Sequence, residues 1–313
     1  MLDLTIAVLL DWIIGDPRWF PHPIIYIGKF IGYLEKIARK EAKNNEILRI
    51  LGLLIVVVVA GASFFIPYAL LKIASVNSII LHIVNIIILW TTIASKSLHT
   101  EAVKVYTSLK NNDLKDARVK LSYIVGRDTK DLSENEVIRA DVETVAENTA
   151  DGVIAPLFYA AIGGAPLAML YKAINTMDSM LGYKNEKFFY IGFFPAKIDD
   201  IFNFIPARIT GLLISFSAPV VKGNIIESIK IMIRDRKNHK SPNCAYPEGA
   251  AAGAMKVQLG GVNTYFGEKV YKPTIGDNIK PLKADNIFQT IKLMYSAEVL
   301  FMIIVFIGNR ILA

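Results

Sequence analysis

The sequence predicts an all-α, polytopic integral membrane protein with about four to six membrane-embedded helices. Of its 313 residues, 53% are hydrophobic and only 20% are charged, which is more apolar than an ordinary soluble domain. Two runs, Ile50–Leu71 and Val76–Ser95, contain no Asp, Glu, Lys or Arg over 22 and 20 positions. A helix of about 20 residues crosses a bilayer core of about 30 Å, so each run is a predicted transmembrane helix.

Three further apolar segments have less regular sequences. Val153–Tyr171 is long enough to span but contains Gly and Pro, Ile209–Val221 is only 13 residues long, and Leu293–Asn309 carries Glu298. Residues 1–15 are apolar apart from two aspartates and lack a basic start and a cleavage site, so no signal peptide is predicted. We therefore expect one membrane domain over residues 1–313, with helical cytoplasmic loops at about 96–150 and 222–290.

Lysine and arginine counts orient these segments. The loops 16–46, 96–150 and 222–290 carry six, nine and eleven of them, whereas 72–75 carries one, which places the three rich loops in the cytoplasm. A full crossing by Val153–Tyr171 would put the polar loop 172–203 outside. We favour a re-entrant arrangement in which 153–171 and 209–221 do not both cross, because Gly/Pro-interrupted apolar segments are typical of it. Two ordinary crossings with an external loop remain the alternative.

The net charge of +7 fits anionic lipid headgroups, and no basic stripe with interleaved aromatics indicates a nucleic-acid partner. The single cysteine, Cys244, excludes a disulfide framework. No Walker-type, dinucleotide-binding or zinc-protease motif is present.

The junction between a polar helix and an apolar segment is the most informative part of the chain. Ser133 and Glu136 fit a capping box that starts a helix over 134–150. On that helix Arg139, Glu143, Glu147 and Asp151 follow at four-residue intervals and share one face. Three stacked carboxylates repel one another, so the stripe needs a cationic partner such as Mg²⁺, an Arg/Lys cluster or a charged substrate.

Two other polar clusters flank apolar segments. Lys172, Asn175 and Gly182, with Asp178 or Ser179, share a helical face, and Asp199, Asp200 and Asn203 form an oxygen-rich group suited to Mg²⁺. An Asp pair capping a helix is the structural alternative for the second. Asp16 and His22 lie in a Pro-rich turn that either orients a substrate or caps a helix. Gly260-Gly261 could form a backbone nest for a phosphate, although a lone Gly pair is weak evidence for one.

The ordered set of these motifs resembles the CobD/CbiB family of cobalamin-biosynthesis membrane proteins, the adenosylcobinamide-phosphate synthases. The resemblance covers residues 3 to 267 and rests on Gly15-Asp16-Pro17 with His22-Pro23, Gly126-Arg127-Asp128-Thr129, Arg139 to Asn148 with Asp151-Gly152, Tyr171-Lys172, Asn175 to Gly182, Asp199-Asp200-x-x-Asn203, Pro206-Ala207-Arg208, Ser241-Pro242-Asn243, Leu259-Gly260-Gly261 and Tyr265-x-Gly267. One departure is Cys244-Ala245, where the family usually has Ala-Gly.

The resemblance implies an ATP- and Mg²⁺-dependent ligase at the cell membrane. Such an enzyme joins a propionate carboxylate of adenosylcobyric acid to aminopropanol or its O-phosphate. On this reading we predict the following residues. The catalytic set is Glu143, Glu147, Asn148, Asp151, Lys172 and Asp178. The set that binds substrate or phosphate is His22, Arg127, Asp128, Arg139, Asn175, Ser179, Arg208 and Asn243. The metal set is Asp199, Asp200 and Asn203.

The resemblance also implies partners, namely the corrinoid, the amino alcohol and the lipid bilayer. A homo-oligomer, or a complex with other membrane enzymes of cobalamin assembly, is a further expectation. Two other classes remain open from the residues alone. A Mg²⁺-dependent prenyl or phospho-alcohol transferase would need similar Asp/Asn clusters at the membrane face. A transporter is disfavoured because the charged residues lie mostly at the ends of the apolar segments.

Overall fold

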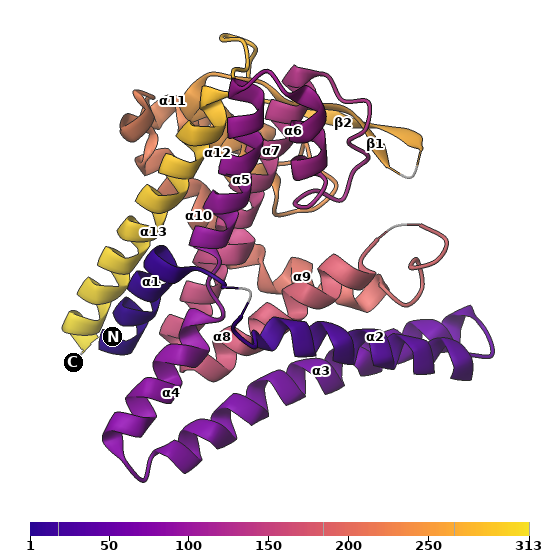
Figure 1. The fold of residues 1–313 in the computed structure, drawn as a ribbon, viewed down its shortest axis with the longest axis vertical. Coiled ribbons are helices and arrows are strands. Elements are labelled where there is room, and N and C mark those ends of the chain that lie inside the picture. Colours follow the sequence, from indigo (N-terminus) through magenta and orange to yellow (C-terminus); the bar gives the residue numbers. More distant parts are fainter. Residues whose placement is uncertain (18, 184, 266, 313) are drawn as a thin grey trace. The chain divides into compact units, whose positions relative to one another are not determined.

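A computed structural model describes residues 1–17, 19–183, 185–265 and 267–312 (Figure 1). It is helical apart from one two-stranded antiparallel sheet, which confirms the all-α class. The chain forms two compact units, each built from two separate stretches. The first unit comprises Met1–Ala94 and Ala155–Asn203, and the second comprises Ser95–Ile154 and Phe204–Ala313. Because the stretches alternate, neither unit is a single continuous part of the chain.

The first unit is made of six helices, and asparagine or histidine caps start three of them. They are α1 (Leu2–Ile14), α2 (Pro23–Glu41), α3 (Asn45–Ala74), α4 (Ser78–Trp90), α8 (Ala155–Leu181) and α9 (Phe193–Phe202). His22, Asn44 and Asn77 each accept a backbone N–H from the first turn that follows, which satisfies a donor the helix cannot pair internally. Apolar residues of α2, α3 and α8, including Ile31, Val56 and Ile174, form the core.

The second unit combines helices with the hairpin. It contains α5 (Ser95–Lys110), α6 (Leu114–Leu121), α7 (Glu134–Asn148), the π-helical turn η1 (Thr149–Ile154), α10 (Phe204–Phe216), the 3₁₀ turn η2 (Ala218–Val221), α11 (Ile225–Asp235), α12 (Ala245–Met255), β1 (Leu259–Tyr265), β2 (Glu268–Ile275) and α13 (Asp285–Leu312). The predicted capping box of Ser133 and Glu136 is present at the start of α7. The Ala/Gly-rich α12 packs on α10 and α11, since small side chains let helix backbones approach closely.

Four stretches within the described residues are long and apolar enough to cross a membrane: Asn45–Ala74, Ser78–Lys110, Glu134–Leu181 and Asp285–Ile311. Their number lies within the predicted range, and large apolar side chains such as Val57, Phe65 and Ile304 are exposed on them. This is the profile of a membrane protein. The apolar α10 is shorter, at 13 residues. The re-entrant arrangement and the sidedness of loop 172–203 stay predictions.

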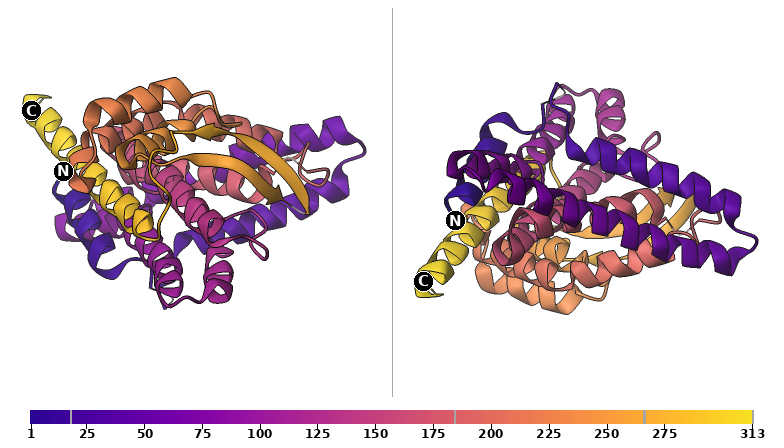
Figure 2. Two further views of the ribbon diagram at one scale, coloured as in Figure 1. Left: turned by 90° about the horizontal axis from the view of Figure 1, so that it is seen from above. Right: turned by 90° about the horizontal axis from the view of Figure 1, so that it is seen from below.

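The structure departs from the sequence-based description at three places and agrees with it at a fourth. The region 222–290 is not wholly helical, because β1 and β2 form a curved hairpin within it (Figure 2). Helix α4 ends at Trp90, and a turn separates it from α5. Helix α7 gives way to a π-helical turn after Asn148. Gly163 and Gly164 break α8, and Gly164 has a φ of 67°, a value open to glycine but unfavourable for other residues. The last break lies at the predicted interruption of Val153–Tyr171.

Candidate functional site

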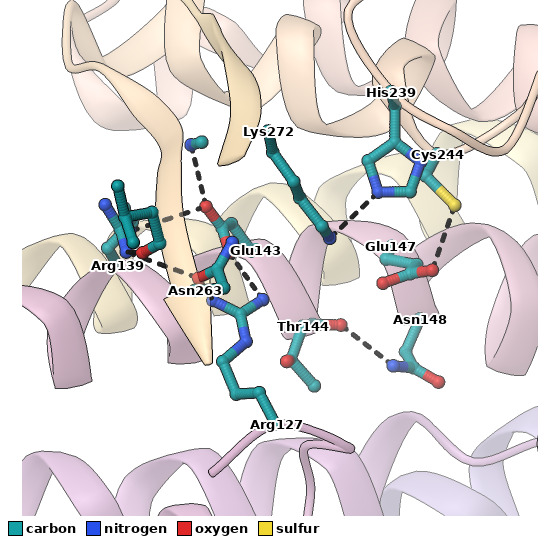
Figure 3. A network of polar contacts seen from close by, with 12 residues as sticks. Arg127, Arg139, Glu143, Thr144, Glu147, Asn148, His239, Cys244, Asn263 and Lys272 are labelled. Carbon is teal, nitrogen blue, oxygen red and sulfur yellow. Dashed lines mark hydrogen bonds and ion pairs between the residues drawn. The ribbon is translucent and has the colours of Figure 1, made fainter. Parts of the chain in front are cut away.

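The centre of the second unit is a buried ion pair between Arg127 and Glu143 (Figure 3). Arg127 Nη2 lies 2.6 Å from Glu143 Oε2, and both side chains are less than one-tenth exposed. Arg127 also donates through Nη1 to Asn263 Oδ1 at 2.7 Å. A charge is expensive to bury unless it is paired and hydrogen-bonded. The ion pair and the contact with Asn263 therefore offset the cost of burying both side chains.

Arg139 completes the pairing from the same helix as Glu143. Its Nη2 donates to Val262 O at 2.7 Å and to Asn263 Oδ1 at 3.3 Å, and its Nε lies 3.8 Å from Glu143 Oε1. The four-residue spacing predicted this last contact. The hairpin supplies the other partners, so the site is built by α7 and β1 together.

Two glycines allow β1 to approach these charged groups. Gly260 and Gly261 have φ values of 80° and 91°, which residues with a side chain seldom adopt. Gly260 N–H donates to Glu143 Oε1 at 2.8 Å. A Cβ atom on Gly261 would lie 2.9 Å from Arg139 Nη1. The Gly260 amide considered for a phosphate therefore binds a carboxylate of the protein instead.

A second group of polar side chains continues along α7 toward α12. Cys244 Sγ donates to Glu147 Oε1 at 2.9 Å. Glu248 is 4% exposed, and burial, followed by the charges of Glu143 and Glu147, raises the pKa of Glu248 well above its usual value. Burial likewise raises the pKa of the Cys244 thiol, with Glu147 adding to the effect. The acidic face of α7 thus meets neutral proton donors as well as cations.

Three more of the predicted residues belong to this unit, namely Asp128, Asn148 and Asp151. Asn148 Nδ2 donates to Thr144 O within its own helix. Asp151 lies in the π-helical turn, whose wider winding moves it out of α-helical phase with Arg139, Glu143 and Glu147. Asp128 pairs with the hairpin: its N–H donates to Thr264 O, and its carboxylate accepts Gly267 N–H.

Arg208 lies beside α12 and is held by aromatic rings. Its guanidinium carbon is 3.5 Å from the centre of the Phe204 ring and 4.3 Å from that of Tyr246. Nη1 also lies 3.2 Å from Asn243 Oδ1. The predicted pair Arg208 and Asn243 is therefore brought together, although the two residues are 35 positions apart.

The first unit has its own buried carboxylate, Asp199 of α9. Asn203 Nδ2 donates to Asp199 Oδ2 at 3.0 Å, and Asn175 Nδ2 lies 3.3 Å from Oδ1. Tyr171 in turn donates its hydroxyl to Asn203 Oδ1 at 2.7 Å. Burial, followed by the charge of Asp178, raises the pKa of Asp199 to about 7. The structure therefore joins Asn175 to Asp199 and Asn203, and the Asp199–Asn203 contact lies within the oxygen-rich group predicted from the sequence.

Other predicted residues of the first unit have local roles. Asp200 faces Lys197 at 3.8 Å, and Ser179 Oγ donates to Asn175 O within α8. Lys172 lies on the same helix, where its carbonyl accepts the Thr176 hydroxyl. His22 caps α2 through Nδ1, and its Nε2 lies 3.3 Å from Asp16 Oδ1. Its capping role is thus structural, and substrate binding by His22 stays a prediction.

Five residues of the polar cluster in the second unit were absent from the predicted set: His239, Cys244, Glu248, Asn263 and Lys272. Glu248 lies in an Ala/Gly run and Lys272 in an alternating strand, so neither stands in a recognisable motif. A charged residue inside the Ala/Gly run was the one available signal, since small residues mark a closely packed, buried helix. Among the described residues, no group of three or more His, Cys, Asp or Glu side chains is arranged to hold a metal ion.

The fold and these clusters define a helical membrane protein with buried, highly charged polar sites. The chain belongs to the CobD/CbiB protein family, whose profile it matches over residues 4–294. It is 64% identical to the cobalamin biosynthesis protein CobD of Clostridium tetani over 304 residues, or 97% of this chain and 96% of that protein. It is 46% identical to the cobalamin biosynthesis protein CbiB of Salmonella typhimurium over 301 residues, covering 96% and 94% of the two chains. No solved structure matches it. The family places the chain in cobalamin biosynthesis.

Proposed function

We propose that this protein is the ATP-dependent amide ligase of its pathway. It would join a propionate carboxylate of adenosylcobyric acid to aminopropanol or aminopropanol O-phosphate. The observation that carries the proposal is the buried second-unit cluster, in a chain of a cobalamin-biosynthesis family. Arg127, Arg139 and Lys272 lie there with Glu143, Glu147 and Glu248. A ligase that handles a carboxylate, phosphates and an amine needs cations and proton acceptors in one desolvated site.

The reaction explains why both signs of charge are required. A carboxylate does not acylate an amine directly, so ATP must first transfer a phosphoryl or adenylyl group to a carboxylate oxygen. The amine nitrogen then attacks the acyl carbon, a C–N bond forms, and the C–O bond to the phosphate group breaks. A cationic group such as Lys272 suits the anionic oxygens in these steps. The attacking ammonium must lose its protons, a role that we assign to the carboxylate of Glu147.

We assign Mg²⁺ to Asp199 and Asn203, with Asp200 nearby. The fit rests on Asp199, a buried carboxylate held by neutral amides and facing the charge of Asp178. A divalent cation would relieve that repulsion. Mg²⁺ commonly takes only one or two protein carboxylates, with water and phosphate oxygens completing its shell, so a larger cluster is not needed. When bound, it would neutralise phosphate charge during phosphoryl or nucleotidyl transfer.

The same proposal covers location and partners. The four apolar stretches fit a multi-pass protein, and we propose that it resides in the cell membrane. Its ligands would be the corrinoid, the amino alcohol or its phosphate, and the lipids around the apolar helices. Assembly as a homo-oligomer, or with other membrane enzymes of cobalamin assembly, would allow a bulky corrinoid to pass between active sites.

The decisive test uses the full chain, purified in detergent or reconstituted in liposomes. It is incubated with adenosylcobyric acid, ATP, Mg²⁺ and either aminopropanol or its phosphate, and the corrinoid product is followed by mass spectrometry. We expect an amide product whose formation consumes ATP and is lost in Glu147→Gln. The matched control is Glu227→Gln, which removes a solvent-facing carboxylate of α11. A folded protein that makes no amide, or a Glu147→Gln variant with full activity, would refute the proposal or that assignment.

A further inference from the structure

His239 has a defined tautomer because of a backbone hydrogen bond. It lies in the segment between α11 and α12, and its Nδ1 accepts the Ser241 N–H at 3.0 Å. A neutral imidazole carries a single N–H, so a ring that accepts at Nδ1 holds its proton on Nε2. Burial, and then the charge of Lys272, lower the pKa of His239, which keeps the ring neutral near physiological pH.

The proton on Nε2 points at another donor. Lys272 of β2 places Nζ 3.1 Å from His239 Nε2 (Figure 3). Burial of the amine acts to lower its pKa, but the carboxylates Glu248 and Glu147 outweigh this effect, so the pKa of Lys272 lies above its usual value. Lys272 is therefore an ammonium group with donors only. An N–H and an ammonium at this distance cannot hydrogen-bond to each other.

His22 provides a comparison for a histidine that accepts a backbone N–H at Nδ1. It too accepts a backbone N–H at Nδ1, from Ile24, and its Nε2 lies opposite the carboxylate of Asp16 at 3.3 Å. The same tautomer thus meets an acceptor in one case and a second donor in the other. Among the ion pairs of the described residues, none within 4.0 Å includes Lys272. The His239–Lys272 pair therefore consists of two donors that no carboxylate of these residues within 4.0 Å bridges.

We propose that His239 Nε2–H and the Lys272 ammonium together bind a phosphate group of a substrate. This assignment rests on the proposed function for the identity of that substrate, which is either the nucleotide or the phosphorylated amino alcohol. We favour phosphate over carboxylate as the ligand because the two arginines of the cluster already have a carboxylate partner. Arginine forks suit carboxylates, and Arg127 and Arg139 already face Glu143. The donors left over are a lysine, which binds phosphate as a point charge, and an imidazole N–H.

Direct binding tests the subsite without any turnover. Inorganic phosphate is titrated into the purified full chain and followed by calorimetry or phosphorus NMR. His239→Asn keeps an acceptor for Ser241 but removes the donor at Nε2, whereas His239→Gln restores a donor toward Lys272. We expect His239→Asn and Lys272→Met each to weaken phosphate binding by about tenfold or more, as a lost hydrogen bond to a charged group implies. His239→Gln and Lys272→Arg should retain most of it.

Lys269→Met is the matched control, because Lys269 is an exposed lysine of the same strand. It should bind phosphate as the parent chain does. If Lys272→Met does not fold, as judged by circular dichroism and gel filtration, the two His239 variants carry the test. Unchanged phosphate affinity in folded His239→Asn overturns the proposal.

Steady-state kinetics then identify the source of the phosphate. A raised KM for ATP alone assigns the subsite to the nucleotide, and a raised KM for aminopropanol phosphate alone assigns it to the amino alcohol. A raised KM for adenosylcobyric acid alone would overturn the phosphate assignment in favour of a carboxylate. Failure of the wider proposal looks different: phosphate binding would still depend on His239 and Lys272 in a protein that forms no amide. Amide formation with all three KM values unchanged would refute the subsite alone.

Discussion

Glu143 and Asp199 are both buried carboxylates, but their partners differ in kind. Glu143 faces two arginines and a backbone N–H, whereas the hydrogen bonds of Asp199 come from two neutral amides. Arginines neutralise a carboxylate, while amides solvate it and leave its charge uncompensated. Burial, followed by the negative charge of Asp178, raises the pKa of Asp199 to about 7, and the two amide hydrogen bonds offset only part of that rise. We infer that the ion pairs of Glu143 organise its site, and that Asp199 is a group able to exchange a proton or accept a cation.

The largest effect should follow from breaking the Glu143 pair on one side. Arg127→Met leaves a buried carboxylate without its closest cation, and such changes destabilise proteins by about 3–5 kcal/mol. Chemical unfolding of the purified protein measures this. The double variant Arg127→Met/Glu143→Leu removes both charges and should recover much of the loss. Equal stability of the single variant and the parent chain would mean that the pair does not organise the site.

The second-largest loss of stability should follow from substituting Gly261, which leaves space for the Arg139 side chain. Gly261→Ala forces a side chain onto a positive φ, a penalty of about 1–2 kcal/mol. It also displaces Arg139, whose hydrogen bonds to charged or buried partners are worth about 1–3 kcal/mol. Gly267→Ala is the control, because Gly267 has a φ of 82° but open space around its would-be Cβ. Thermal unfolding should rank Gly261→Ala as the more damaging, and equal losses would argue against the contact with Arg139.

The raised pKa of Asp199 predicts that the stability of the protein depends on pH. That pKa is raised from 3.8 to about 7 in the folded protein, so the protonated form of Asp199 is favoured by folding. Its contribution to stability is full below the unfolded pKa and is lost as the pH rises through about 7, at roughly 1.4 kcal/mol per pH unit between the two values. The groups acting on it are Asp178, Asp200, Asn175, Asn203 and Tyr159.

Unfolding of the parent chain and of Asp199→Asn from about pH 5 to about pH 8 measures this dependence. As the pH is raised, the stability of the variant should fall less than that of the parent chain. Identical slopes would show that Asp199 does not titrate in this range and would remove the contrast with Glu143.

The smallest expected loss of stability comes from substituting Tyr171, which is linked to Asp199 through Asn203. Tyr171→Phe removes the hydroxyl that donates to Asn203 Oδ1 at 2.7 Å. A buried neutral hydrogen bond contributes about 1 kcal/mol, and the loss should appear as a modest drop in thermal stability. Tyr26→Phe, at an exposed tyrosine of the same unit, should leave stability unchanged. A Tyr171→Phe variant as stable as this control would show that Asn203 is held by Asp199 alone.

The contacts that the sequence predicted are those between residues three or four positions apart on one helix. Ser133 and Glu136 form their capping box, Arg139 faces Glu143 one turn away, and Asn203 bonds to Asp199 at the same spacing. The long uncharged runs likewise determine the apolar helices. These features follow from a period of 3.6 residues and from the length needed to span a bilayer. The family resemblance added the reaction, which spacing alone does not contain.

Tertiary structure alone decided which distant residues meet. Gly260 is 117 positions from Glu143, Cys244 is 97 from Glu147, and Lys272 is 33 from His239. The β1–β2 hairpin brings β1 to Glu143 and places Lys272 beside His239, yet it is a short element within a region expected to be helical. No local pattern records such pairings, because they depend on how separate elements pack. The sequence therefore determined where charge is carried along each helix, and packing determined which charges are neutralised and which remain for a ligand.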